Sequence, residues 1–367
     1  MNKACSRLLA AFLLMASVSF AQEAKLASAN RKQIETAVAK FMAKESAPGI
    51  SVAVVKDGEY VWSAGFGMAD LENSVPATSQ TLYRLASVSK PITAVATMQL
   101  WQQGKLDLDA PVQKYCPAFP EKSEGPITTR ELLSHKAGIR HYYLGQVLDP
   151  QVSSTKHLKD PIQDGLEFFK KDALVSRPGA EFHYSTYGYS LVGCVIEGAS
   201  GAKYVDYVTR SVFAPAAMTT AQADDRFAVI PHRTRFYQKD ESGRIANADF
   251  LDSSYKIPGG GWLASAEDMA HFEVAMLNDT LVKRATRDLM WTATLDKKGG
   301  GYGLGWGVTK QGDVFTFSHN GGQQGTSTFI AIVPEQKLGV VVLINMEEAD
   351  QETLGTELLK ILQDGSK

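Results

Sequence analysis

The sequence predicts an α+β protein: an antiparallel sheet formed from both ends of the chain, flanked by helices, with an inserted and mostly helical lobe. β-rich runs lie on both sides of Asp57-Gly58, and β-rich runs return over residues 303–345. Between them, from Ser87 to about Leu251, the pattern changes to helices and loops. Strands at both chain ends bury their apolar faces well in one shared sheet, so the helical segment is predicted to be an insertion.

The first elements are predicted to be a helix and a β-hairpin. Residues Arg31–Lys44 place Ile34, Val38 and Phe41 at helical spacing, which indicates one apolar face. A Pro-Gly pair then ends this pattern. The Asp57-Gly58 dipeptide between two strand-like runs is a strong local signal for a hairpin.

Later helices are indicated by their ends. Thr128 with Glu131, and Ser265 with Asp268, have the three-residue spacing of an N-terminal cap. Gly201 is typical of a helix C-terminus. The segments in which these signals and apolar spacing predict helix are residues 126–138, 187–201, 203–213, 263–278 and 352–363.

Residues 1–21 are predicted to be a secretory signal peptide, because a basic start is followed by a short apolar run that ends in small residues. An uncleaved membrane anchor is the alternative. Residues 22–367 are predicted to form one domain, with an α/β part over 22–86 and 252–367 and a helical lobe over 87–251. The expected location is therefore periplasmic or secreted.

Composition excludes several kinds of partner. The chain of 367 residues carries a net charge of −2 with no run of like charges, so neither nucleic acid nor a membrane surface is an expected partner. The histidines show no metal-binding spacing, and Gly299–Gly307 matches no nucleotide-binding loop. We expect no metal and no cofactor. The expected partner is a small-molecule or peptide substrate, and the oligomeric state stays open.

Two cysteines, Cys116 and Cys194, remain after the signal peptide. An exported protein could oxidise them, but their sequence positions do not show that they meet. The interpretation favoured from sequence is a pair of buried free thiols, with a disulfide left open.

Four Ser-x-x-Lys pairs occur in the chain, and only Ser87 with Lys90 opens a long apolar helical pattern. Residues three apart share a helix face, so Lys90 can reach the Ser87 hydroxyl. Free N–H groups at a helix start can stabilise an oxyanion. A serine hydroxyl becomes a useful nucleophile when a neighbour takes its proton. An ordinary helix cap with a solvated lysine is the alternative, so the wider sequence has to decide.

Two further motifs follow in order: "YSTYGY" around Tyr184, and "SHNGG" with His319 between strand-like runs. Together with Ser87 and Lys90 they resemble the serine β-lactamases and penicillin-binding proteins, in particular the class C-like branch with its esterases and D-specific peptidases. The resemblance covers nearly the whole chain after residue 21 and implies the β-lactamase/transpeptidase-like fold.

The resemblance implies acyl transfer without metal or cofactor. Ser87 would be the nucleophile, and Lys90 and Tyr184 would move the proton. The Tyr184 oxygen would be the general base, with its phenolate favoured by nearby positive charge. The oxyanion would lie between the N–H groups of Ser87 and Gly322, directly after His319-Asn320-Gly321.

The motifs also depart from those of class C β-lactamases. Thr186, His319 and Asn320 stand where those enzymes carry Asn, Lys and Thr, which implies a weaker hold on an acylamide and on a carboxylate. The predicted function is an exported serine hydrolase that cleaves an ester or a peptide-like amide through a Ser87 acyl-enzyme. A class C-like β-lactamase and a non-catalytic penicillin-binding or assembly protein are the alternatives.

Overall fold

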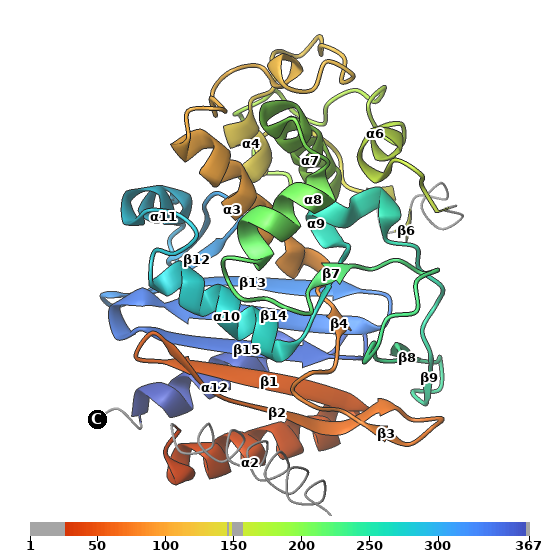
Figure 1. Cartoon of the computed structure of the whole chain (residues 1–367), viewed down its shortest axis with the longest axis vertical. Coiled ribbons are helices and arrows are strands. Elements are labelled where there is room, and N and C mark those ends of the chain that lie inside the picture. Colours follow the sequence, from red (N-terminus) through yellow and green to blue (C-terminus); the bar gives the residue numbers. More distant parts are fainter. Residues whose placement is uncertain (1–25, 145–146, 149–156, 365–367) are drawn as a thin grey trace, which may run out of the picture.

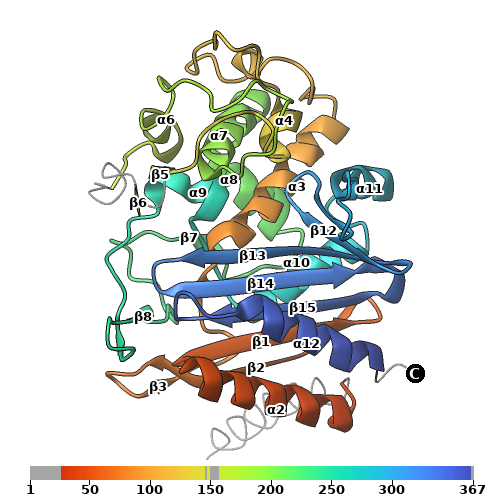
Figure 2. The same cartoon turned by 180° about the vertical axis from the view of Figure 1, so that it is seen from behind.

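The computed structural model describes residues 26–144, 147–148 and 157–364. The predicted signal peptide lies outside these residues and stays a prediction. Figure 1 shows a sheet in the lower half of the molecule and a helical region above it. The first helix and the last helix lie close together at the lower end, as the view from behind in Figure 2 also shows.

One 8-stranded sheet dominates the described part of the chain, in the order β11-β12-β13-β14-β15-β1-β2-β3. All neighbouring strands in it are antiparallel. β15 pairs with β1, so the two chain ends share the sheet, and the predicted fold class is confirmed. The strands are β1 (Gly49–Lys56), β2 (Glu59–Asp70), β3 (Val75–Pro76), β11 (Gly300–Tyr302), β12 (Gly307–Gln311), β13 (Val314–Gln323), β14 (Thr326–Val333) and β15 (Leu338–Ile344).

Helices cover both faces of this sheet. α10 (Ala266–Leu277) packs on one face, while α2 (Ser28–Glu45) and α12 (Gln351–Asp364) pack on the other, as comparison of Figures 1 and 2 shows. Every residue of β14 and β15 is buried as a result. This explains why both strands are continuous apolar runs in the sequence rather than alternating ones.

The predicted hairpin and caps are present. Asp57 and Gly58 both have positive φ, +55° and +76°, as a two-residue turn of the hairpin type requires. Thr128 and Ser265 each close a capping box with the acidic residue three positions later. Gly201 ends its helix in the left-handed conformation at φ 69°. The helix predicted over 203–213 is α-helical only to Val208, and a wider π-type turn completes it.

Outside the large sheet, the described part of the chain contains further helices, one three-stranded sheet (β4-β10-β7) and the strand pairs β5-β6 and β8-β9. These helices are α3 (Ser89–Gln102), α4 (Thr129–Leu133), α6 (Pro161–Leu166), α7 (Thr186–Ser200), α8 (Tyr204–Val208), α9 (Ile257–Gly260) and α11 (Arg284–Trp291). These strands are β4 (Tyr83–Arg84), β5 (Tyr143–Leu144), β6 (Val147–Leu148), β7 (Gln222–Ala223), β8 (Tyr237–Lys239), β9 (Ile245–Asn247) and β10 (Trp262–Ala264). α3, α7 and α9 pack against one another at the junction with the sheet.

The expectation of two free thiols is wrong: Cys116 and Cys194 form a disulfide, with their Cα atoms 5.5 Å apart. Cys194 lies in α7, and Cys116 follows a short 3₁₀ turn. The two segments can meet because α7 carries Gly198, where a Cβ would come within 1.7 Å of the Tyr115 carbonyl oxygen. Only a glycine permits that approach, and the cysteine spacing alone carried no sign of it.

Candidate active site

Ser87 lies in a 3₁₀ turn, Ala86–Val88, between β4 and the start of α3. The predicted α-helix therefore begins two residues later than Ser87. Ala86 has a φ of +47°, a conformation that costs energy for any residue with a Cβ. Ala86 and Val88 are buried while Ser87 between them is partly exposed. The strained turn thus presents the serine hydroxyl outward from an otherwise buried segment.

Lys90 is fully buried directly behind this hydroxyl. Its Nζ lies 3.0 Å from Ser87 Oγ, 3.1 Å from Thr186 Oγ1 and 2.8 Å from the Gly259 carbonyl oxygen. Burial, and secondarily the charge of Lys256, hold the pKa of Lys90 well below its usual range. A neutral amine at this position can donate to Thr186 and Gly259 while its lone pair accepts the Ser87 proton.

Tyr184 stands just before α7, next to the same lysine. Lys90 Nζ lies 4.8 Å from the centre of the Tyr184 ring. Burial raises the pKa of Tyr184, and a hydrogen bond with Ser87 lowers it only in part. The sequence suggested that positive charge would favour a Tyr184 phenolate. Burial of the ring acts against a phenolate and favours the neutral phenol, and the lowered pKa of Lys90 weakens the positive charge beside it.

His319 points into the site from β13 and is a neutral residue. Its Nδ1 lies 2.6 Å from the Asn320 carbonyl oxygen, which can only accept, so Nδ1 carries the ring proton. Nε2 lies 2.9 Å from the Tyr302 hydroxyl and accepts a hydrogen bond from it. Burial first, and the charge of Lys90 second, lower the pKa of His319 to about 3. His319 therefore supplies no positive charge for a substrate carboxylate.

The side chain of Asn320 points away from Ser87. Its Nδ2 donates to Glu352 of α12 at 3.1 Å, because successive strand residues face opposite sides of a sheet. Of the predicted substrate-binding side chains, Thr186 and His319 thus lie beside Lys90 and Tyr184, and Asn320 does not.

The end of β13 offers backbone groups to the site. β12 pairs with β13 only as far as Ser318, so residues 319–323 have an open edge on that side. The Ser87 turn packs against β13. A Cβ on Gly321 would come within 2.6 Å of the Leu85 carbonyl oxygen and 3.0 Å of the Ser87 nitrogen. The bare backbone of Gly321 is what allows this approach, and Gly322 follows on the same edge.

A cavity of about 520 Å³ opens at this end of the strand, lined by Gly322, Gln323 and Tyr142 among others. A second hollow of about 680 Å³ between α11 and β13 contains Trp291 and Phe317 and none of the site residues named above. Of these two cavities, the first contains Gly322, which the sequence predicts as an oxyanion-binding residue.

The sequence reasoning missed several residues around Ser87. His135 is buried with φ +58°, accepts the Ser185 N–H at 3.1 Å, and its ring centre lies 4.3 Å from that of Tyr184. Tyr302 belongs to the Gly-rich segment Gly299–Gly307. This segment matches no nucleotide-binding motif, and its sequence suggested no other function. Lys256 belongs to one of the four Ser-x-x-Lys pairs, but Ser253 in that pair opens no apolar helical pattern, so the motif did not point to the lysine.

Within the described ranges, no group of histidine, cysteine and acidic residues has the arrangement of a metal site. In the same residues, no helix combines the length and apolarity that a membrane crossing requires.

Comparison with known proteins identifies the fold. A human mitochondrial protein named serine beta-lactamase-like protein LACTB is 34% identical over 380 residues, covering 79% of this chain and 69% of that protein. Protein flp of Staphylococcus aureus is 28% identical over 330 residues, or 88% of this chain and 64% of its own length.

Solved structures agree. The octameric penicillin-binding protein homologue from Pyrococcus abyssi matches with a TM-score of 0.79 and 28% identity, covering 91% of this chain and 77% of that one. D-amino acid amidase from Ochrobactrum anthropi shares the fold with a TM-score of 0.79 at 21% identity over 93% of this chain and 100% of that one. The Beta-lactamase family profile matches residues 34–363. The chain therefore belongs to the beta-lactamase family of serine hydrolases.

Proposed function

We propose that this protein hydrolyses an ester or a peptide-like amide through an acyl-enzyme on Ser87. The observation that carries the proposal is the buried Lys90 amine, 3.0 Å from Ser87 Oγ and held by two further acceptors. Burial holds the pKa of Lys90 well below its usual range, which favours the neutral amine that can take the serine proton. A site that had lost catalysis need not keep this arrangement, which speaks against a purely non-catalytic assembly protein.

In the proposed mechanism, Ser87 Oγ attacks the substrate carbonyl carbon while its proton passes to Lys90 Nζ. The N–H groups of Ser87 and Gly322 stabilise the oxyanion. The neutral Tyr184 phenol then donates to the leaving oxygen or nitrogen and is reprotonated from Lys90. Water releases the acyl group by the reverse sequence, so that no proton is gained or lost. Tyr184 is thus a proton donor here and not the phenolate base that the sequence suggested.

The third motif favours esters and amides over β-lactams. A β-lactam antibiotic presents a carboxylate next to the reacting ring, and a cation near His319 would be its natural partner. His319 is neutral, and both of its ring nitrogens are already engaged. We therefore place a class C-like β-lactamase activity second to an esterase or peptidase activity.

We also propose that the protein is exported to the periplasm or secreted, with cleavage after Ala21. The signal-like start of the sequence supports this. So does the buried disulfide, since such bonds persist in oxidising compartments. N-terminal sequencing of the exported protein should begin at Gln22. An intact Met1 on the exported chain would contradict the cleavage.

The test of the activity is intact mass over time with a fluorophosphonate probe and with benzylpenicillin, together with hydrolysis of phenyl acetate. Wild type should gain one adduct and hydrolyse the ester, and Ser87→Ala should do neither. Ser200→Ala is the matched control, because Ser200 heads another Ser-x-x-Lys pair at the far end of α7. Equal hydrolysis by wild type and Ser87→Ala would refute the proposal. Rapid formation and loss of a penicilloyl adduct would make β-lactam hydrolysis the favoured function.

A further inference from the structure

Lys256 is a buried lysine beside the nucleophile turn that the proposed mechanism does not use. It ends the 3₁₀ turn Ser254–Lys256, immediately before α9, and is 2% exposed. Its Cδ lies 3.6 Å from the point where Gly260 would carry a Cβ, and the Ala86 carbonyl carbon lies 3.7 Å from the same point. Lys256 and Ala86, the residue that precedes Ser87, therefore both border Gly260.

The Lys256 ammonium has aromatic neighbours and no counter-ion. Nζ lies 5.1 Å from the centre of the Tyr142 ring and 5.3 Å from that of Tyr255. Among the described residues, no hydrogen bond or ion pair to Nζ is formed. Tyr142 also lines the cavity that contains Gly322. A charged group in such surroundings costs free energy unless an opposite charge joins it.

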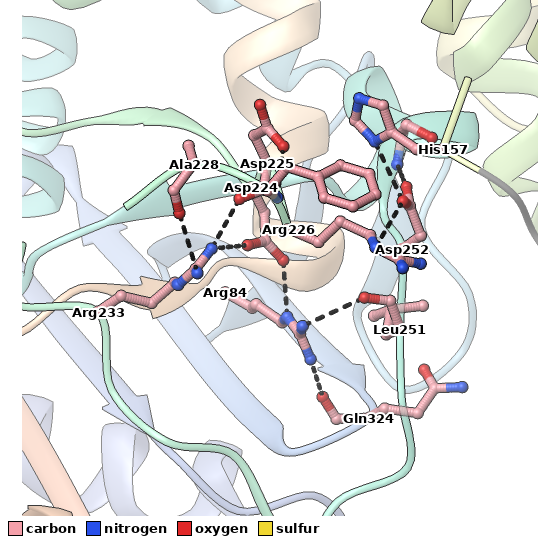
Figure 3. Close-up of polar contacts among 12 residues, drawn as sticks. Arg84, His157, Asp224, Asp225, Arg226, Ala228, Arg233, Leu251, Asp252 and Gln324 are labelled. Atoms are coloured by element: carbon pink, nitrogen blue, oxygen red, sulfur yellow. Dashed lines mark hydrogen bonds and ion pairs between the residues drawn. The ribbon is translucent and has the colours of Figure 1, made fainter. Parts of the chain in front are cut away.

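The acidic residues on neighbouring segments are already engaged by other groups, as Figure 3 shows. Asp224 pairs with Arg84 at 2.7 Å and with Arg233 at 3.3 Å. Asp252 lies 3.1 Å from His157 and 3.8 Å from Arg226.

These ion pairs exclude Lys256, and its other charged surroundings are mainly repulsive. Burial, followed by the charge of Arg84, lowers the pKa of Lys256 to about 7, and Asp224 opposes this only in part. The charge of Lys256 in turn lowers the pKa of Lys90 and of His141. In the part of the chain that the structure describes, no carboxylate forms an ion pair with Lys256, and the charged groups that lower its pKa and that of Lys90 are cationic.

We propose that Lys256 is a specificity-determining residue that binds an anionic group, a carboxylate, in the acyl part of the substrate. The acyl part is the half that stays bonded to Ser87, and Lys256 borders Gly260 together with Ala86, the residue before Ser87. This inference rests on the proposed function, because it names the substrate class of the same site. Its chemistry is a charge-assisted hydrogen bond from Nζ to the carboxylate, which also restores the charged form of the lysine. His319, neutral and fully hydrogen-bonded, does not compete for the anion.

Acidic residues in the neighbouring cavity could instead favour a positively charged substrate. Asp249, Glu347 and Glu348 also line the cavity that contains Gly322. A substrate bound mainly through these residues would carry a positive charge instead. The experiment therefore has to compare a negative, a neutral and a positive acyl group of similar length.

The first measurement is kcat/KM for three phenyl esters: the monophenyl ester of adipic acid, its neutral carboxamide, and phenyl 6-(trimethylammonio)hexanoate. Wild type should prefer the carboxylate ester. In Lys256→Met the ratio of kcat/KM for the carboxylate ester to that for the carboxamide should fall about tenfold or more, through KM. Lys256→Arg should keep most of the preference. A residue that only supports the fold, or only tunes Lys90, would change both esters equally and leave the ratio constant, which would overturn the inference.

The second measurement separates this inference from the proposed function. Adipate binding is measured by calorimetry on Ser87→Ala and on Ser87→Ala/Lys256→Met, where no turnover is needed. We expect adipate to bind the first variant and the Kd to rise at least about tenfold in the second. Ester hydrolysis by Ser87→Ala at the wild-type rate, together with Lys256-dependent adipate binding, would refute the mechanism and keep the anion site. Equal adipate affinity in both variants, or no binding to either, or a preference for the trimethylammonium ester, would refute the anion site.

Discussion

The disulfide between Cys116 and Cys194 allows a stability prediction with a worked magnitude. The two residues are 78 positions apart. In the chain-entropy description, a cross-link that closes a loop of this length removes about 15 cal/mol/K from the unfolded chain, or about 4.5 kcal/mol at 25 °C. The loop includes Tyr184 and Thr186, so the bond stabilises the segment that brings both residues to Lys90.

The disulfide is removed in two ways: by the double substitution Cys116→Ala/Cys194→Ala and by reduction of the wild type. Reduction is included because it breaks the bond and leaves both cysteine side chains in place. Urea unfolding followed by tryptophan fluorescence should show both forms less stable than the oxidised protein by about 3–5 kcal/mol. Thiol titration of the unfolded, unreduced chain from residue 22 onward should find no free thiol. Two free thiols, or an oxidised protein no more stable than the reduced one, would refute the reasoning.

Three further predictions concern ionisable groups. If neutral Lys90 is the base, kcat/KM should already be at its plateau near pH 8. Lys90→Arg should lower kcat/KM at least about a thousandfold, because arginine stays protonated. An acidic limb of the pH profile centred near pH 10 would contradict this. Tyr302→Phe removes the proton donor to buried His319 Nε2, so thermal unfolding should show a loss of about 1–3 kcal/mol. Burial raises the pKa of Glu273 well above 4.5, so its contribution to stability is present below the unfolded pKa and is lost as the pH rises. Glu273→Gln should therefore gain about 1.4 kcal/mol per pH unit over wild type above pH 5, and a gain that does not change with pH would be contrary evidence.

Local patterns predicted the parts of the fold that neighbouring residues decide. The Asp57-Gly58 turn needs positive φ at both positions, and Asp and Gly are residue types that adopt this conformation readily. The Ser265 cap depends on a residue three positions away. Ser87 and Lys90 meet because they are one helical turn apart, although the turn is of the 3₁₀ type. In each case the physical cause lies within a few residues of the effect.

Contacts between distant segments could not be predicted in the same way. Cys116 and Cys194 meet because Gly198 lets two segments approach closely, which no cysteine spacing encodes. Tyr302 reaches His319 through pairing of β11 with β12 and of β12 with β13. The protonation state of Tyr184 depends in a related way on how deeply other segments bury its ring, and sequence motifs do not report burial.

The positions of the positive charges in the site explain how its third motif differs from that of class C β-lactamases. Class C β-lactamases carry a lysine in the third motif, where this chain has the neutral pair of His319 and Tyr302. Here the second lysine near Ser87 comes instead from Lys256, beside α9. A third buried ammonium would interact unfavourably with both lysines, since like charges in a low-dielectric site repel strongly. His319→Lys alone should therefore destabilise the protein, and combining it with Lys256→Met should recover part of the loss. A non-additive double mutant of this kind would show that the ammonium groups at the two positions repel each other, and additive losses would show that the two positions act independently.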